Sequence, residues 1–322
     1  MSILIYAESS SEGKFKKVAF ELASYAKKVA ESLQTTVTAV TVNNADVSEL
    51  AKYGVDKVLK VSNNQLNNFT AKAYADVINQ AAQKENAKLI VLSSTTDSLY
   101  MAPLVAVGLQ GGFASNVVGL PLSIAPFQVK RTAFSNKAFV TTELETEVKV
   151  LSLAKNSYGI VENNSTLTEA NFAPTLQEGD FSVKVENVEK SSGKVTIADA
   201  EVVVSGGRGL KGPENWSLVE DLAAVLGGAT ACSKPVSDLG WRPHSEHVGQ
   251  TGKPVATNLY IAIGVSGAIQ HIAGINSSKI KVVINSDPEA PFFKVADYGV
   301  VGDAFDIVPR LTEKLREFKA NS

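Results

Sequence analysis

Residues 258–274, NLYIAIGVSGAIQHIAG, place a buried strand, a tight turn and the start of a helix in one continuous segment. The apolar run Leu259–Val265 predicts a strand covered on both faces, which is typical of parallel sheets. The turn at Ser266–Gly267 leads into a predicted helix over Ala268–Ala273, which Gly274 ends. This strand–turn–helix segment predicts an α/β fold with a parallel sheet.

Two more predicted strands flank that segment, and each ends in a polar or glycine-rich turn. Ala200–Ser205 is followed at once by GGRGLKG, and Lys281–Ile284 is followed by Asn285. The loop His247–Val255, HVGQTGKPV, is also polar and rich in glycine. Ligands of open α/β sheets bind beyond the carboxyl ends of the strands, where the strand order reverses. We therefore expect the binding chemistry of this chain at these turns.

The glycine-rich turn permits two interpretations. Residues 207–212, GRGLKG, fit the pattern G-x-G-x-x-G before a predicted helix over Glu214–Leu226. Such a turn can direct backbone N–H groups at a pyrophosphate, and Arg208 can hold a phosphate with two hydrogen bonds. A plain strand–helix turn with a surface arginine fits equally well. A nicotinamide site would need an acid at the end of the next strand, whereas Glu220 and Asp221 fall inside the predicted helix.

The first half of the chain alternates apolar strands with helices, which again predicts a parallel sheet. Strands are expected at Ile3–Ala7, Val37–Val42, Val55–Val61 and Leu89–Ser93, and helices at Phe15–Leu33, Val47–Tyr53, Phe69–Lys84 and Ser98–Gln110. Beyond about Ser115, short strands at Phe127–Thr132, Lys137–Thr142 and Val148–Leu153 predict an antiparallel or mixed extension of the sheet. We interpret Val161–Glu178 as a connection and Phe181–Val188 as an arm into a second domain.

Composition changes near residue 190, because 15 of the 23 glycines and all three histidines lie beyond it. We expect two α/β domains. Residues 1–190 would form an N-terminal nucleotide-binding-like domain with added antiparallel strands, and residues 191–322 a C-terminal Rossmann-like domain that carries the chemistry. The first domain lacks a glycine-rich phosphate loop, so no ligand is assigned to it.

Charge and cysteine content exclude several classes of function. The 31 Lys and Arg residues against 33 Asp and Glu residues leave a net charge of −2, which argues against a nucleic-acid partner. The single cysteine, Cys232, excludes a disulfide framework and cysteine-ligated metal clusters. No apolar run approaches the roughly 18 residues of a spanning helix, and the opening residues are not a signal peptide. We expect no metal site, no membrane insertion and a cytoplasmic location.

The candidate reactive residues give no catalytic constellation. His244 and His247 lack a third zinc ligand nearby, and no G-x-S-x-G turn is present. A lone histidine such as His271 is more often a hydrogen-bonded core residue than a binding residue. Both alternatives stay open for His271 from the residues alone, and no catalytic residue is predicted.

Four stretches together resemble one family. Residues 259–274, with VVINSDPEAPFFKVADYGVV at 282–301, resemble the signature of the electron-transfer flavoprotein alpha subunit. SGGRG at 205–209 and VGQTG at 248–252 match the same family in the same order. The resemblance is continuous over about residues 195–315, and the first half agrees in layout and in its opening residues.

The resemblance implies an electron carrier without substrate turnover, with one FAD held by the C-terminal domain. The partner would be a beta subunit that carries AMP and packs against residues 1–190. Electrons would come from dehydrogenases, such as those of acyl-CoA oxidation, and pass to a quinone oxidoreductase. A bacterial cytoplasm is expected, with the mitochondrial matrix as the alternative.

Carried over by position, the resemblance also implies the residues that bind FAD. These are Arg208, Ser233, Lys234, Val248, Gly249, Gln250, Thr251, Ser266, Gly267, Ala268, Ile269, Gln270, His271, Asn285, Asp303 and Ala304. Arg208 would contact the diphosphate, the Thr251 hydroxyl would lie near flavin N5, and His271 near the N1–C2 carbonyl edge. Asn285 and Asp303 would serve the adenosine end. Lys234 stands where many members have arginine; it keeps the charge but loses the planar fork.

Three other functions remain as alternatives. A bifurcating member of the family would hold a second FAD on the beta subunit instead of AMP. A nicotinamide-dependent dehydrogenase is suggested by the G-x-G-x-x-G pattern but disfavoured by the misplaced acid. A nucleotide-binding module confined to residues 1–190 would leave the C-terminal motifs without a purpose.

Overall fold

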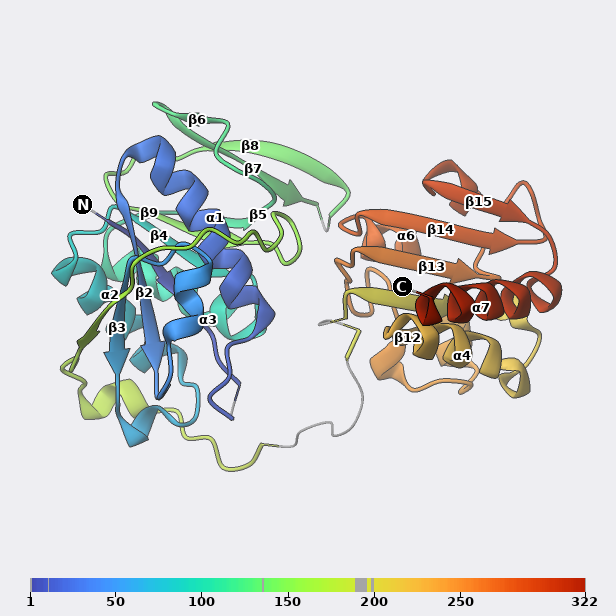
Figure 1. Ribbon diagram of the computed structural model, residues 1–322, viewed down its shortest axis with the longest axis horizontal. Coiled ribbons are helices and arrows are strands. Elements are labelled where there is room, and N and C mark those ends of the chain that lie inside the picture. Colours follow the sequence, from blue (N-terminus) through green and yellow to red (C-terminus); the bar gives the residue numbers. More distant parts are fainter. Residues whose placement is uncertain (1, 11, 135, 189–195, 198–199, 322) are drawn as a thin grey trace. The chain divides into compact units, whose positions relative to one another are not determined.

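The chain forms two compact α/β units in this computed structural model, which describes residues 2–10, 12–134, 136–188, 196–197 and 200–321 (Figure 1). The first unit takes in residues 1–133 and 139–189, and the second takes in residues 190–322 with the short segment 134–138. The division expected at residues 190 and 191 lies outside the described residues. Each unit has a sheet dominated by parallel strands, which confirms the predicted fold class.

The first unit is built on one ten-stranded sheet. A parallel series forms most of it, in the spatial order β10 (Thr168–Asn171), β3 (Lys57–Val61), β2 (Thr36–Val42), β1 (Ser2–Tyr6), β4 (Leu89–Ser93), β9 (Lys149–Leu153) and β5 (Gly112–Val117). An antiparallel extension follows, with β7 (Phe127–Ala133) beside β5, and β6 (Ser123–Ile124) and β8 (Ala138–Glu143) beside β7. The strand order reverses between β1 and β4.

Helices cover both faces of this sheet (Figure 1). α1 (Lys17–Leu33) packs on one face and buries Leu22, Ala26 and Val29, which recur at helical spacing. α2 (Ala71–Lys84) and α3 (Thr96–Gly108) pack on the other face. The 3₁₀ turns of this unit are η1 (Ser48–Lys52), η2 (Asn64–Leu66) and η3 (Glu178–Phe181).

Several details of the first unit differ from the sequence predictions. β9 was expected in an antiparallel or mixed extension of the sheet, but it lies inside the parallel series, because it pairs with β4 and β5 in parallel. β5 and β10 were not predicted, since they are rich in glycine, alanine and polar residues. The expected arm Phe181–Val188 begins at the last residue of η3 and is otherwise irregular chain.

The second unit is a five-stranded sheet in which every neighbouring pair is parallel. Its spatial order is β12 (Ala229–Cys232), β11 (Val202–Gly206), β13 (Leu259–Ile263), β14 (Ile280–Asn285) and β15 (Tyr298–Val301). The chain starts at β11, moves outward to β12 and returns to β13 on the other side. The strand order therefore reverses between β11 and β13, where α/β folds bind ligands.

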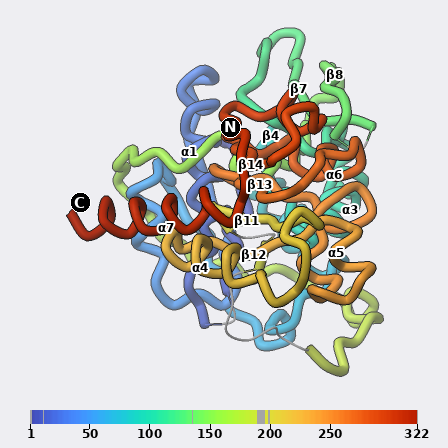
Figure 2. The backbone as a smooth tube through the Cα atoms, turned by 90° about the vertical axis from the view of Figure 1, so that its right-hand side faces the viewer, coloured from blue at the N-terminus to red at the C-terminus, as the bar shows by residue number. Residues whose placement is uncertain are grey.

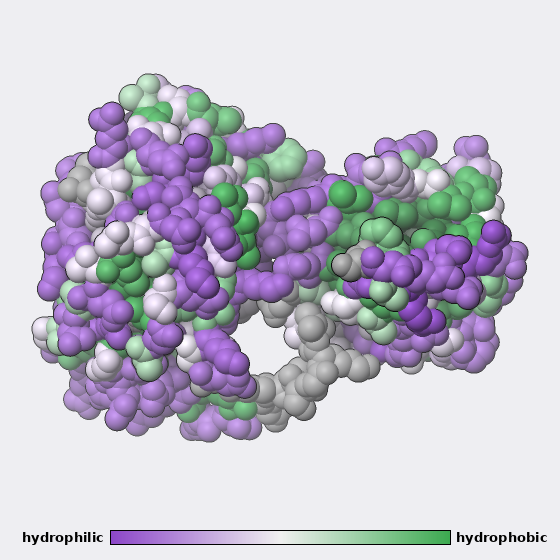
Figure 3. Space-filling view, in the orientation of Figure 1, coloured by the Kyte–Doolittle hydropathy of each residue, from purple (hydrophilic) through white to green (hydrophobic). Residues whose placement is uncertain are grey.

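Two layers enclose the second sheet (Figure 2). α4 (Ser217–Leu226) and α7 (Ala304–Ala320) cover one face, and α6 (Ile269–Ile275) covers the other. The outer surface of α7 is hydrophilic (Figure 3), as expected for the charged residues of its last turns. The remaining elements are α5 (Lys234–Asp238), η4 (Arg208–Leu210), η5 (Pro213–Asn215), η6 (His244–Glu246) and η7 (Pro291–Lys294). The helix predicted from Glu214 begins only at Ser217, because η5 precedes it.

No helix in the described ranges has the length and apolar character that a membrane crossing requires.

Candidate functional site

A pocket of about 520 Å³ opens at the carboxyl ends of the second sheet, where the strand order reverses. Its walls are the turns after β11, β12, β13 and β14, the loop from His247 to Thr251, and the start of α6. The following residues expected to bind the cofactor line it: Arg208, Ser233, Lys234, Val248, Gly249, Gln250, Thr251, Ser266, Ala268, Gln270, His271 and Asn285.

Four of the expected residues are absent from the lining. Gly267, at φ +85°, shapes the turn, because a Cβ there would lie 2.5 Å from the Phe292 backbone nitrogen. Ile269 is exposed, and Ala304 is buried in the core against α4. Asp303 caps α7 by accepting a hydrogen bond from the Phe305 N–H at 2.9 Å.

The glycines after β11 bring two turns together. The N–H of Gly207 donates to the Ile263 carbonyl at 2.9 Å, and the N–H of Gly209 donates to the Gly264 carbonyl at 3.1 Å. A Cβ on Gly207 would lie 2.1 Å from the Gly264 oxygen. These two N–H groups are therefore used within the protein, so they do not point at a pyrophosphate as the motif suggested. Gly264 forms the other side of this close approach, with φ +61° and with a Cβ position only 2.8 Å from Gly209 Cα. No role for Gly264 was predicted from the sequence.

The turn after β13 offers a run of backbone donors instead. No acceptor in the described part of the chain takes the N–H groups of residues 266–270, and Ser266, Ala268 and Gln270 line the pocket. Successive free N–H groups of this kind form a concave site for anionic oxygens. Arg208 is exposed at the same pocket and forms no ion pair within the described ranges.

His271 is a buried imidazole with one nitrogen in use. It is 6% exposed, its Nε2 lies 2.8 Å from the Tyr260 hydroxyl, and its Nδ1 has no hydrogen-bond partner among the described residues. Burial, with a smaller contribution from His247, lowers the pKa of His271 to about 4, and the Val248 backbone partly opposes this change. The ring is therefore neutral near pH 7.

A second buried imidazole, His247, lines the same pocket. It is 1% exposed and its Nδ1 also lacks a partner in the described ranges. Burial, followed by the charges of His244 and Lys234, lowers the His247 pKa. The sequence singled out His247 only as an incomplete zinc ligand. His247 lines the pocket because the loop that follows it folds back over its ring. Gly252 of this loop packs so closely that a Cβ there would lie 2.8 Å from His247 Nδ1.

Lys234 lies at the pocket rim and is already paired. Its Nζ is 2.8 and 2.9 Å from the two carboxylate oxygens of Asp238, one helical turn further on, and both side chains are exposed. The positive charge that the pocket receives from Lys234 is therefore partly neutralised.

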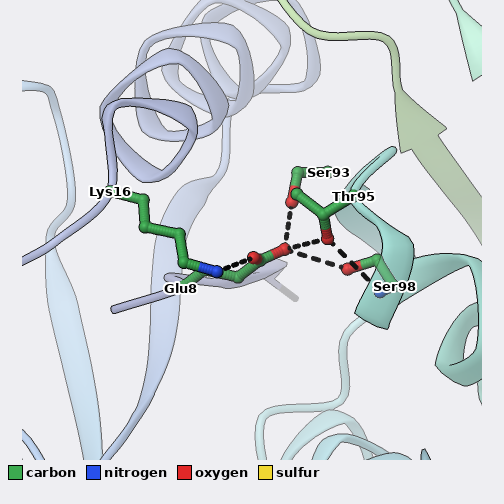
Figure 4. A network of polar contacts seen from close by, with 5 residues as sticks. All are labelled: Glu8, Lys16, Ser93, Thr95 and Ser98. Atoms are coloured by element: carbon green, nitrogen blue, oxygen red, sulfur yellow. Dashed lines mark hydrogen bonds and ion pairs between the residues drawn. The ribbon is translucent and has the colours of Figure 1, made fainter. Parts of the chain in front are cut away.

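At the corresponding corner of the first unit, a buried carboxylate is bound by side chains of the chain itself (Figure 4). Glu8, directly after β1, is buried and accepts hydrogen bonds from Ser93, from Thr95 at 2.6 Å and from Ser98 at 3.1 Å. Its other oxygen is 3.1 Å from Lys16 Nζ. The strand order of this sheet reverses here, so a carboxylate of the protein stands at the place where such folds bind ligands.

No group of histidine, cysteine, aspartate and glutamate side chains in the described ranges could hold a metal ion. Burial raises the Cys232 thiol pKa to about 12, so this thiol is unreactive near neutral pH.

Comparison with known families covers both units. A family profile described as the electron transfer flavoprotein FAD-binding domain matches residues 196–276, and one described as the electron transfer flavoprotein domain matches residues 3–190. An electron transfer flavoprotein subunit alpha of Thermoanaerobacterium thermosaccharolyticum is 34% identical over 98% of both chains. The chain belongs to this family.

Two further alpha subunits of the family are similar over nearly the whole chain. The protein of Bacillus subtilis is 31% identical over 97% of this chain and 96% of its own length. That of Syntrophomonas wolfei is 36% identical over 95% of this chain and 96% of its own length. The likeness to electron transfer flavoprotein alpha subunits is confirmed, and the dehydrogenase alternative is set aside.

The pocket fits the cofactor of the family, which is FAD. The buried Nδ1 of His271, which has no hydrogen-bond partner among the described residues, needs a polar partner from a ligand. The exposed Arg208 and the N–H groups of residues 266–270, which are not used within the described ranges, can turn to the anionic oxygens of the same ligand. Electron transfer flavoproteins carry electrons and do not turn over a substrate of their own. Their alpha subunit implies a beta subunit as its partner.

Proposed function

We propose that this chain holds FAD in the pocket of its second unit and relays electrons from dehydrogenases, such as acyl-CoA dehydrogenases, to a quinone oxidoreductase. It would act in a bacterial cytoplasm, as a heterodimer with a beta subunit that carries AMP. The observation that carries the proposal is the pocket itself, where backbone donors, a guanidinium and a buried imidazole converge at the strand-order reversal.

The lining residues divide between two ends of the cofactor. Arg208 and the N–H groups of residues 266–270 supply positive potential for the diphosphate. Gln250 and Thr251 stand on the loop over His247 and would face the flavin ring, with His271 as a donor at the ring edge. Bound FAD supplies the acceptance and release of electrons one at a time. The chain orients the ring, keeps water from its edge, and places donors where negative charge develops.

Asn285 has a supporting role in this proposal. Its Nδ2 donates to the Val265 carbonyl at 3.1 Å, and its Oδ1 accepts from the Asp287 N–H at 3.1 Å. Asn285 therefore fixes the turn after β13 to the turn after β14 at the pocket wall. Asp303 is committed to its helix cap and lies 4.0 Å from Lys211, so we expect it to contribute little to FAD binding.

A face of α3 supports the expected packing of the first unit against the beta subunit. α3 is apolar on its outer side, where Leu99, Tyr100, Leu104 and Val107 are exposed, Tyr100 by 68% and Val107 by 77%. Exposed apolar groups in a cluster are typical of protein interfaces. Val107→Asp should weaken heterodimer formation measured by analytical ultracentrifugation. Val183→Asp, at an equally exposed position of the same unit, serves as the control.

The test of the proposed function is stepwise dithionite reduction of the protein co-purified with its beta subunit, followed by visible absorption. The expected result is one FAD per heterodimer, with a one-electron stage between the oxidised and fully reduced spectra. Two FAD per heterodimer would indicate the bifurcating alternative. A colourless complex that FAD does not reconstitute would overturn the assignment of the pocket.

A further inference from the structure

Tyr260 is held rigidly behind His271, on the side away from the pocket. It lies in β13, is fully buried, and stacks on Phe292 with ring centroids 6.4 Å apart and planes 6° apart. Its ring centroid is 6.0 Å from that of His271, and its hydroxyl is 2.8 Å from His271 Nε2. The phenol therefore has one fixed position relative to the imidazole.

Tyr260 and His271 together carry two exchangeable protons, one on the phenol and one on the imidazole. Burial raises the pKa of the Tyr260 phenol far above its ordinary value, so the phenol keeps its O–H. A neutral imidazole carries one N–H, on either Nδ1 or Nε2. Hydrogen positions are not fixed by heavy atoms alone, so the tautomer has to be inferred from the network.

The network favours one arrangement. His271 Nε2 is the hydrogen-bond partner of the phenol in the described ranges. The Ser205 hydroxyl lies near enough to lower the pKa of the phenol, but it forms no hydrogen bond with the phenol or with any other described residue. If Nε2 carried the proton, the buried phenolic O–H would lose this acceptor, and the nearby Ser205 hydroxyl does not lie in hydrogen-bonding geometry to replace it. Leaving a buried donor unpaired costs about 1–3 kcal/mol.

We propose that Tyr260 is a positioning residue for the cofactor site: its O–H donates to Nε2 of His271, keeps the imidazole proton on Nδ1, and so presents an Nδ1–H donor to the pocket. The proposal rests on the proposed function of this pocket as the FAD site. It accounts for a buried Nδ1 that has no hydrogen-bond partner among the described residues. Nδ1–H then meets an electron-rich oxygen or nitrogen at the edge of the flavin.

Tyr260→Phe is the direct test, because it keeps the aromatic ring and its packing on Phe292 and removes only the donor. We expect ¹⁵N NMR of histidine-labelled heterodimer to show His271 with its proton on Nδ1 in the parent protein. In Tyr260→Phe we expect the proton to move to Nε2 or to exchange between both nitrogens. FAD affinity should fall about three- to tenfold, and the potential of the first reduction step should fall.

Two variants separate positioning from packing. Phe292→Leu disturbs the ring stack, and we expect it to weaken FAD binding without moving the His271 proton. In a His271→Gln background, Tyr260→Phe should cause no further loss of FAD affinity, because the two residues act as one unit.

Three outcomes would overturn the proposal: a parent protein with the proton on Nε2, an unchanged tautomer in Tyr260→Phe, or additive losses in the double variant. The tautomer can be read with or without FAD. A parent protein that shows the Nδ1–H tautomer but binds no FAD would contradict the proposed function and leave the Tyr260–His271 arrangement intact.

Discussion

Lys234 and Asp238 form an ion pair at the rim of the candidate pocket, and together they set the charge there. Their exposed ion pair holds Lys234 on its own helical turn, with contacts of 2.8 and 2.9 Å. Exposed pairs contribute about 0.2–1 kcal/mol. The lysine can still attract a negatively charged cofactor, but Asp238 opposes this attraction.

The first prediction follows from that opposition. Lys234→Ala should weaken FAD binding about two- to fivefold and lower the flavin reduction potential. Asp238→Asn should act in the opposite direction, because it releases the lysine charge. Isothermal titration with FAD at low and high salt measures both effects, and salt should reduce both. Equal effects of the two variants would contradict a role for charge.

The second prediction concerns pH and the buried His271. Its pKa is about 4 in the folded chain, whereas an unfolded histidine titrates near 6.5. As the pH falls, the histidine is therefore protonated in the unfolded state before it is protonated in the folded state. The free energy of unfolding decreases between pH 6.5 and pH 4 for this reason. Stability is fully present above pH 6.5, and the full loss is about 3 kcal/mol. We expect urea unfolding of the second unit to weaken from pH 7.5 to pH 5.

The matched variant is His271→Gln, whose unfolding free energy should depend less steeply on pH over the same range. Other titrating groups are common to both proteins and cancel in the difference. His247 keeps part of the slope, because its pKa is also lowered. Parallel pH curves for parent and variant would show that His271 is not buried in its neutral form.

At the scale of elements, the glycine-rich turn after β11 holds the two central strands of the second unit together. We predict that Gly207→Ala destabilises this unit by about 1–3 kcal/mol and releases FAD, because its Cβ meets the Gly264 carbonyl. The control is Gly227→Ala, at φ +68° with no atom within 4 Å of the added Cβ. That variant should cost about 1 kcal/mol of backbone strain and retain FAD. Equal FAD loss in both would contradict a local role for Gly207.

In the first unit, Glu8 joins β1, β4 and α3 through one carboxylate. We predict that Glu8→Ala destabilises this unit by about 3 kcal/mol, because it removes the common acceptor of three hydroxyl groups. Lys16→Ala should cost less than 1 kcal/mol, since the lysine side chain is 41% exposed and can return to water. Chemical denaturation measures the unfolding free energy of both variants. A larger loss of stability in Lys16→Ala than in Glu8→Ala would contradict this account.

The sequence predicted the elements whose pattern is strong and missed those defined by their neighbours. β1, β4, β13 and β14 were predicted within two residues, because each contains a short apolar run. β1 and β4 are buried along their whole length, whereas only part of β14 is buried. β10 is polar and exists as a strand only through its pairing with β3. The place of β9 between β4 and β5 depends on contacts between distant segments, which local periodicity does not contain.

The same limit applies to the candidate site. Family resemblance named most of the lining, including His271, but not Tyr260, because a tyrosine in an apolar strand looks like core until its hydroxyl meets an imidazole. The role of Gly264 also depends on a turn more than fifty residues away. Contacts of this kind join segments that are far apart along the chain, so they cannot be predicted from the local pattern of a single sequence.

At the scale of the whole molecule, two separate cores predict two separate unfolding events. The apolar residues of the first unit pack into two clusters on either side of its sheet, and those of the second unit pack into two others. The lining of the pocket that we propose for FAD belongs, within the described ranges, to the second unit. A ligand stabilises the unit that binds it by RT ln(1 + [L]/Kd), about 2.7 kcal/mol at a hundredfold excess over Kd.

We therefore expect calorimetry of the chain without its partner to resolve two transitions, of which FAD raises only one. Gly207→Ala should lower that same transition and make it insensitive to FAD, whereas Glu8→Ala should lower only the other. This crossed pattern assigns each transition to its unit without cutting the chain. A single transition that both variants lower equally would mean that the two units unfold as one cooperative body.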